Sequence, residues 1–177
     1  MNKFVSFSLL LVVVTISACT NSINKKPNTS TYFDLKEYFE NEAKRLNREN
    51  PKVEKTVNDN GKQETKAVLN TIWLNELSVF INSNINKPAW SKSYSVTSTD
   101  STEEYKALDS SLKTQFIKIS KGKTGIDKIF IQNHTTNELY ELDEKLYYES
   151  KKIYRIERVQ KATMLKESTF SIVGKFL

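Results

Sequence analysis

The chain has 177 residues, of which 38% are hydrophobic and 27% are charged, and its formal net charge at pH 7 is +6. This length suits one folded domain. Because Cys19 is the only cysteine, the chain cannot form an internal disulfide or a metal site built from several thiolates.

Residues 1–18 have the layout of an export signal. Residues 1–3 form a short head with one positive charge, and residues 4–16 are a mostly apolar run of about the length of a signal h-region. A helix that spans a bilayer needs about 20 apolar residues, which is longer than this run. We therefore expect a cleaved signal peptide.

The end of this segment, Ile16-Ser17-Ala18-Cys19, resembles the bacterial lipobox, in which an aliphatic residue and two small residues precede a cysteine. The resemblance implies that a diacylglyceryl group is added to the Cys19 sulfur, that cleavage separates Ala18 from Cys19, and that the new amino group is acylated too. One acyl chain holds a protein only marginally, so stable anchoring needs the several chains that lipoproteins carry. Cys19 is therefore the expected lipid attachment site.

Two other interpretations of Cys19 are a chance cysteine after an ordinary secretory signal and part of an uncleaved anchor. As a lipoprotein, the chain would keep residues 19–30 as a polar tether and residues 31–177 as a single domain. The ten residues 21–30 reach at most about 33 Å when extended, so the domain would stay near its membrane. In Gram-negative lipoproteins an aspartate after the cysteine favours the inner membrane. Thr20 therefore implies the outer membrane, and the lack of an acidic cluster after Cys19 favours its periplasmic face.

The first part of the domain predicts helices and a hairpin. Residues 31–50 place apolar side chains at intervals of three and four, which indicates an amphipathic helix. Residues 52–68 alternate around Asn60-Gly61, a strong hairpin signal, and their polar strands favour a sheet edge. Residues 70–82 repeat the helical spacing and predict a second amphipathic helix.

From residue 94 onward the hydrophobic period changes mainly to two, which predicts strands. Turns are expected at Lys121-Gly122 and at residues 133–137, 150–152 and 166–168, and such short connections pair strands antiparallel. The expected fold class is α+β, with two N-terminal amphipathic helices packed on a curved, mainly antiparallel meander sheet of about six to eight strands. A closed or half-open barrel is the alternative.

Several residues invite a chemical interpretation. Gly122-Lys123-Thr124 resembles a phosphate-binding loop only in part, because the motif needs a glycine where the chain has Ile117. His134, the sole histidine, lacks a Cys/His cluster, so we expect a solvated turn residue and no metal site.

The acidic residues Glu138, Glu141, Asp143 and Glu144 crowd one predicted strand. Two carboxylates form a catalytic pair only where their environments drive their pKa values apart. Glu141 and Asp143 should lie on the polar face opposite Tyr140, which favours a solvated, ion-paired surface. We therefore expect no catalytic residues and no cofactor.

Tyrosines on the long strands are the remaining candidates. Such side chains often line ligand or partner surfaces, although on long strands they more often fill the core. Tyr140, Tyr148 and Tyr154 are the residues that would line a concave face.

The body resembles small envelope lipoproteins in size and layout only. We expect a membrane-anchored lipoprotein of the bacterial envelope with a non-enzymatic binding or envelope-support domain. Its partners would be the membrane, through Cys19, and an envelope protein, lipid or glycan. A carrier or sensor for an apolar ligand is one alternative and an unrecognised hydrolase is another. The lysines are spread along the chain and an exported protein rarely meets nucleic acid, so no nucleic-acid partner is expected.

Replacement of Cys19 tests the anchor. Radiolabelled fatty acid should enter the wild-type protein and be absent from Cys19→Ala, because the acylated sulfur is then missing. Equal labelling of the two proteins would refute the assignment.

Overall fold

The computed structural model describes residues 31–123 and 125–177. The predicted signal peptide, the lipid attachment site at Cys19 and the tether lie outside the described residues. Within the described part of the chain, no helix is both long enough and apolar enough to cross a membrane.

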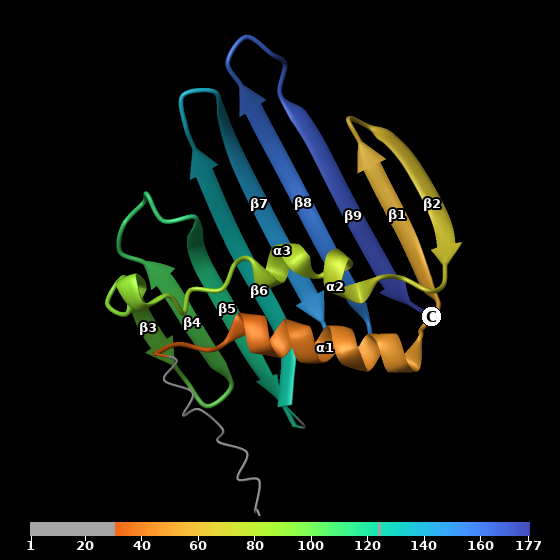
Figure 1. The fold of residues 1–177 in the computed structure, drawn as a ribbon, viewed down its shortest axis with the longest axis horizontal. Coiled ribbons are helices and arrows are strands. Elements are labelled where there is room, and N and C mark those ends of the chain that lie inside the picture. Colours follow the sequence, from red (N-terminus) through yellow and green to blue (C-terminus); the bar gives the residue numbers. More distant parts are fainter. Residues whose placement is uncertain (1–30, 124) are drawn as a thin grey trace, which may run out of the picture.

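One antiparallel sheet dominates the fold, with the spatial order β2-β1-β9-β8-β7-β6-β5-β4-β3 (Figure 1). Its nine strands are β1 (Val53–Asp59), β2 (Lys62–Val68), β3 (Tyr94–Ser98), β4 (Thr102–Ala107), β5 (Thr114–Gly122), β6 (Gly125–Thr136), β7 (Tyr140–Glu149), β8 (Ile153–Ala162) and β9 (Ser168–Phe176). Strands β3 to β9 form the predicted meander, and β1 pairs with β9. The β1–β2 hairpin lies at one edge, as its polar strands predict. Among residues 31–123 and 125–177 the sheet has nine strands rather than six to eight. It is open there, with β2 and β3 at opposite edges, and these strands do not close into a barrel.

The first predicted helix is confirmed as α1 (Leu35–Glu49). It begins after Asp34, whose Oδ1 accepts a hydrogen bond from the Glu37 N–H at 3.0 Å. A side-chain oxygen at this position satisfies an amide that has no partner inside the helix. The helix ends at Asn50, which adopts a left-handed conformation with φ of 41°.

The second predicted helix is wrong in its length. Residues 70–82 contain two four-residue turns, α2 (Trp73–Glu76) and α3 (Ser78–Ile81), which meet at Leu77 with φ of −91° and ψ of 4°. The Ser78 hydroxyl donates to the Asn75 carbonyl at 2.7 Å, and such local bonds compete with a regular helix. A single 3₁₀ turn, η1 (Pro88–Trp90), follows. The break still buries Trp73 and Leu77.

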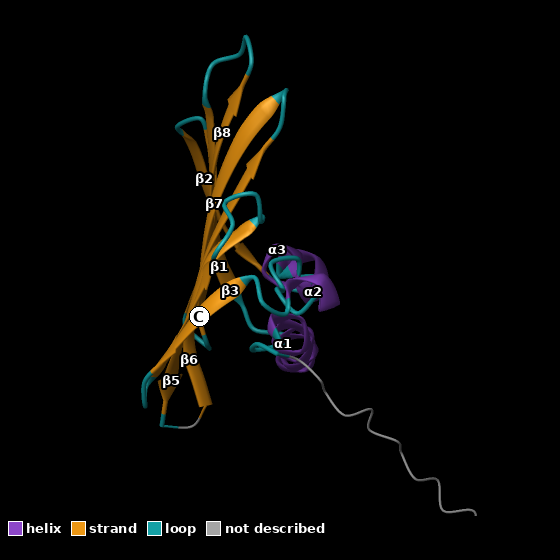
Figure 2. Ribbon diagram, turned by 90° about the vertical axis from the view of Figure 1, so that its left-hand side faces the viewer, coloured by secondary structure: helices purple, strands orange, loops and turns teal. Residues whose placement is uncertain are grey.

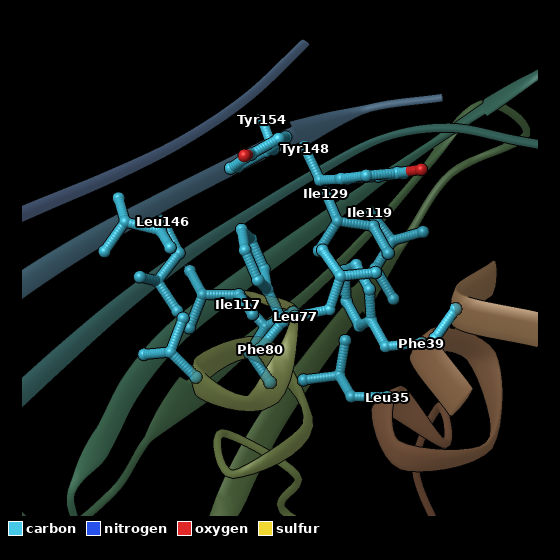
Figure 3. Close-up of a cluster of buried hydrophobic side chains, with 14 of the residues drawn as sticks. Leu35, Phe39, Leu77, Phe80, Ile117, Ile119, Ile129, Leu146, Tyr148 and Tyr154 are labelled. Atoms are coloured by element: carbon cyan, nitrogen blue, oxygen red, sulfur yellow. The ribbon is translucent and has the colours of Figure 1, made fainter. Parts of the chain in front are cut away.

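The helices lie on one face of the sheet and form a second layer (Figure 2). Leu35 and Phe39 from α1, together with Leu77 and Phe80, point toward the sheet (Figure 3). The buried strand residues that they face alternate along the central strands, as the period of two requires. They include Ile117, Ile119, Ile129, Ile131, Leu146, Tyr148, Tyr154 and Ile156.

Two tyrosine hydroxyls tie the sheet to the helices. Tyr148 donates to the Glu42 carboxylate of α1, and the Arg45 Nε also donates to Glu42, at 2.9 Å. Tyr154 donates to Glu76 of α2 at 2.7 Å. Burial, reinforced by the adjacent carboxylates, raises the pKa of both tyrosines, so the hydroxyls stay protonated donors.

The Tyr154 ring fills the space beside Gly174 of β9 that a side chain would otherwise occupy. A Cβ atom at Gly174 would lie 2.0 Å from Tyr154 Cε1, well inside van der Waals contact. The ring also packs edge-to-face against Trp73, with centroids 6.1 Å apart. The absence of a side chain at Gly174 therefore permits this part of the core.

The Glu42→Gln variant tests the hydrogen bond between Tyr148 and Glu42. Burial alone would raise the pKa of Glu42, but hydrogen bonds from Arg45 and Tyr148 more than offset it, so the pKa lies below its ordinary value of 4.5. A depressed folded-state pKa contributes stability above about pH 4.5, and this contribution is lost as the pH falls through the folded pKa. Urea unfolding should show a deficit of about 1–3 kcal/mol for Glu42→Gln at pH 7 that shrinks on acidification. Glu40→Gln, at an exposed pair with Lys36, should change little, and a deficit independent of pH would contradict the assignment.

Gly174→Ala tests the close approach. The added methyl group must displace the Tyr154 ring, and overpacking of this kind typically costs about 1–3 kcal/mol of unfolding free energy. Lys175→Ala, at the next position on the exposed face, should stay within about 0.5 kcal/mol of the wild type. Equal stabilities of the two variants in urea would show that β9 does not hold Tyr154 in this way.

Candidate functional site

The helices leave one end of the sheet uncovered. The uncovered end consists of the ends of β6 to β9 that are joined by the turns at residues 137–139 and 163–167, at the top of Figure 1. In the side view the strands continue well beyond α1, α2 and α3 (Figure 2). Both faces of the sheet are therefore accessible there, and each carries a hollow.

The helix-side hollow has a volume of about 490 Å³. Its residues stand at paired positions on three adjacent strands: Leu142 is opposite Gln160, Glu144 is opposite Arg158, and Arg158 is opposite Phe170. The complete lining is Leu142, Glu144, Arg158, Gln160, Ser168 and Phe170. Leu142 and Phe170 supply apolar surface beside polar groups, as small-ligand sites commonly do.

A buried carboxylate lies beneath this hollow. Glu144 is 4% exposed and accepts a hydrogen bond from the Arg158 Nε at 2.8 Å. Asn133 Nδ2 donates to the same carboxylate at 3.2 Å, and the Lys113 ammonium lies 3.8 Å away. Two cations surround one anion, so this cluster carries a net positive charge. Asn133 Oδ1 is buried without a hydrogen-bond partner among the described residues.

The tip of the uncovered end is apolar. Leu139, Met164 and Leu165 are 73%, 99% and 74% exposed. The Thr163 N–H donates to the Leu139 carbonyl at 3.0 Å, which holds the two turns together. We call these three exposed side chains the apolar tip. Large exposed apolar side chains gathered in one place are typical of surfaces that contact a partner.

The second hollow lies on the opposite face of the sheet and also has a volume of about 490 Å³. Except for Val159, the residues that line it have polar or charged side chains, and they include Gln132, His134, Asp143, Lys145 and Lys161. His134 and Asp143 are opposite each other on β6 and β7, with His134 Nδ1 2.9 Å from Asp143 Oδ1.

The prediction of His134 as a turn residue is wrong, because β6 continues to Thr136. The turn forms later, where Asn137 Oδ1 accepts hydrogen bonds from the N–H groups of Leu139 and Tyr140 at 2.8 and 3.0 Å. An asparagine side chain that binds amides two and three residues ahead stabilises a turn at that point. His134 is therefore held in register on a strand.

The predicted ligand-lining tyrosines do not lie together at either hollow. Tyr148 and Tyr154 are 0% and 1% exposed and belong to the core under the helices. Tyr140 is half-buried near the start of β7. Their ligand-lining role stays a prediction, and Tyr148 and Tyr154 pack in the core.

The predicted acidic strand divides between the two faces. Glu141 and Asp143 lie on the other face of β7 from Tyr140 and Leu142, as the alternation predicts. Glu144 lies on the helix side. Sequence reasoning considered Glu144 only as part of the acidic strand and missed Arg158. The signal for Glu144 is a charge between two apolar residues of the same face, Leu142 and Leu146. Arg158 lies between Ile156 and polar Gln160 on its face, so only the strand register that places it opposite Glu144 identifies it.

The geometry thus identifies an amphipathic hollow and a polar hollow on opposite faces of one sheet end. The helix-side hollow adjoins both the buried Glu144 cluster and the end of the sheet that bears the apolar tip. No family model, no curated protein and no solved structure matches the chain.

Proposed function

We propose that the chain is a lipid-anchored protein of the bacterial cell envelope whose uncovered sheet end is a non-enzymatic binding surface. The anchor rests on the lipobox resemblance at Cys19. Thr20 favours the outer membrane, and the lack of an acidic cluster after Cys19 favours its periplasmic face. The observation that carries the binding role is the helix-side hollow, in which Leu142 and Phe170 flank a cationic cluster.

The ligand that best fits this surface has an apolar part and an acidic group. The apolar part would lie on Leu142 and Phe170, where burial contributes about 25 cal/mol per Å² of apolar area. The acidic group would face Arg158, which lines the hollow. Lys113, whose ammonium lies 3.8 Å from Glu144, adds a second positive charge, and the two charges exceed the single charge of Glu144. An anionic amphiphile, such as a lipid, meets both requirements.

Carriage of such an amphiphile is the second candidate function. The volume of the hollow, about 490 Å³, falls within the range of small-molecule sites, roughly 300–1,000 Å³. Tyr148 and Tyr154, two of the tyrosines that the sequence predicts for the cavity of a carrier, are buried in the core. A carrier would therefore hold its ligand at the uncovered end of the sheet.

Native mass spectrometry of the full chain, extracted from membranes in mild detergent, tests this proposal. The wild type should retain a co-purifying lipid-like mass, and the double variant Leu142→Ser/Phe170→Ser should retain at least about tenfold less. Val173→Ser is the matched control, because Val173 is half-buried on the opposite face of β9.

The outcomes separate the candidate functions. Loss of a lipid mass in the double variant alone supports a site for an amphiphile. Loss of a glycan or a protein in the double variant alone would also support the helix-side hollow as the binding surface, but with that molecule as its ligand. Equal recovery from the double variant and Val173→Ser would refute the helix-side hollow as the binding surface.

A further inference from the structure

Three side chains of the types that bind divalent cations lie close together at the polar hollow, and two of them, His134 and Asp143, line it. His134 lies on β6, and Glu141 and Asp143 lie two residues apart on β7, so all three project from the sheet face opposite the helices. His134 stands directly opposite Asp143 in the strand register. The linear sequence shows no cluster of histidines and cysteines, but strand pairing supplies two carboxylates instead.

The three groups are close enough to share one ion. One ligand atom from each of His134, Glu141 and Asp143 lies within 4.8 Å of the others. Bonds of about 2.0–2.2 Å to a tetrahedral zinc ion place its ligand atoms about 3.3–3.6 Å apart. Side-chain rotations alone can close this difference, since the strands already fix the backbone positions.

The carboxylates of this cluster are incompletely paired. The Asp143 carboxylate has His134 as its partner, whereas the Glu141 carboxylate makes no hydrogen bond or ion pair with another described residue. Lys161 is opposite Glu141 in register and Lys145 lines the same hollow, but neither forms an ion pair with Glu141. A cation between the two carboxylates would offset their mutual repulsion.

We propose that His134, Glu141 and Asp143 form a binding site for a divalent transition-metal ion, with Zn²⁺ as the best match. One imidazole and two carboxylates are ligands that zinc accepts, and three protein ligands leave a fourth position for water. That position would face the hollow of about 490 Å³. Mg²⁺ fits less well, because it prefers oxygen ligands and retains several waters.

Zinc titration of the metal-stripped full chain in detergent tests the site. Calorimetry should give one Zn²⁺ per chain for the wild type. Because the chain has one histidine, its imidazole resonances report directly on that side chain, and they should shift or broaden with the same stoichiometry. MgCl₂ at equal concentration should leave them unchanged.

Variants identify the ligands. His134→Ala, Glu141→Gln and Asp143→Asn should each weaken zinc binding by at least about tenfold, the lower end of what even outer-shell changes cost at metal sites. Glu157→Gln is the matched control on the same face of the sheet and should bind zinc as the wild type does. Lys161→Met should bind zinc more tightly, because it removes a competing charge from the hollow.

The proposal is overturned if zinc binding to the wild type is not saturable, or if His134→Ala binds zinc as tightly as Glu157→Gln. Should a ligand variant fail to fold, the wild-type imidazole resonances decide the matter. If they do not change at saturating zinc, His134 is not a ligand. The readouts are independent of co-purified lipid, so this test can fail while the proposed function stands.

Discussion

The helix layer is smaller than the sheet that it covers, and the rest of the structure follows from this mismatch. Helix α1 has 15 residues, which gives a length of about 22 Å. Nine strands about 4.8 Å apart span about 38 Å, and the 12 residues of β6 extend about 40 Å. Along β7 the consequence is visible residue by residue, because Tyr148 and Leu146 are buried under the helices and Glu144 marks the boundary. Beyond that boundary both sheet faces are accessible, and both hollows lie there.

Directional bonds fix the place of the helix layer on the sheet. The hydroxyls of Tyr148 and Tyr154 reach carboxylates on α1 and α2, so each helix has a defined position relative to the central strands. Gly174 gives the Tyr154 ring the room that this arrangement needs. A buried polar group is costly unless it is satisfied, so these bonds favour one docking position over neighbouring ones. The helices therefore hold one position on the covered half of the sheet, and the uncovered half continues from these same strands.

Hydrophobic periodicity predicts local elements well here because each strand and α1 bury one face. It predicts the Asn60-Gly61 hairpin, the antiparallel meander and the opposite directions of Glu141 and Leu142. It does not predict the break at Leu77, because the spacing of Trp73, Leu77 and Phe80 suits either a helix or two short turns on the same core. The uncovered end could not be predicted either, since which half of a strand a helix covers depends on tertiary packing. The metal-site candidate depends on the register that places His134 beside Asp143, and no linear spacing contains that register.

The central claim is that the helix-side surface of the uncovered end is free once the purified protein has been stripped of its ligand and is covered in the native envelope. Hydroxyl-radical footprinting of Phe170 and Leu142, in purified protein and in intact membranes, tests this claim most directly, with exposed Met164 as a second reporter. Ile72, which precedes α2 and is 68% exposed, and the fully buried Tyr148 set the upper and lower limits of labelling. The account predicts strong labelling of Phe170 and Leu142 in the purified, ligand-free protein and clear protection in membranes. Equal labelling in the two preparations would contradict it.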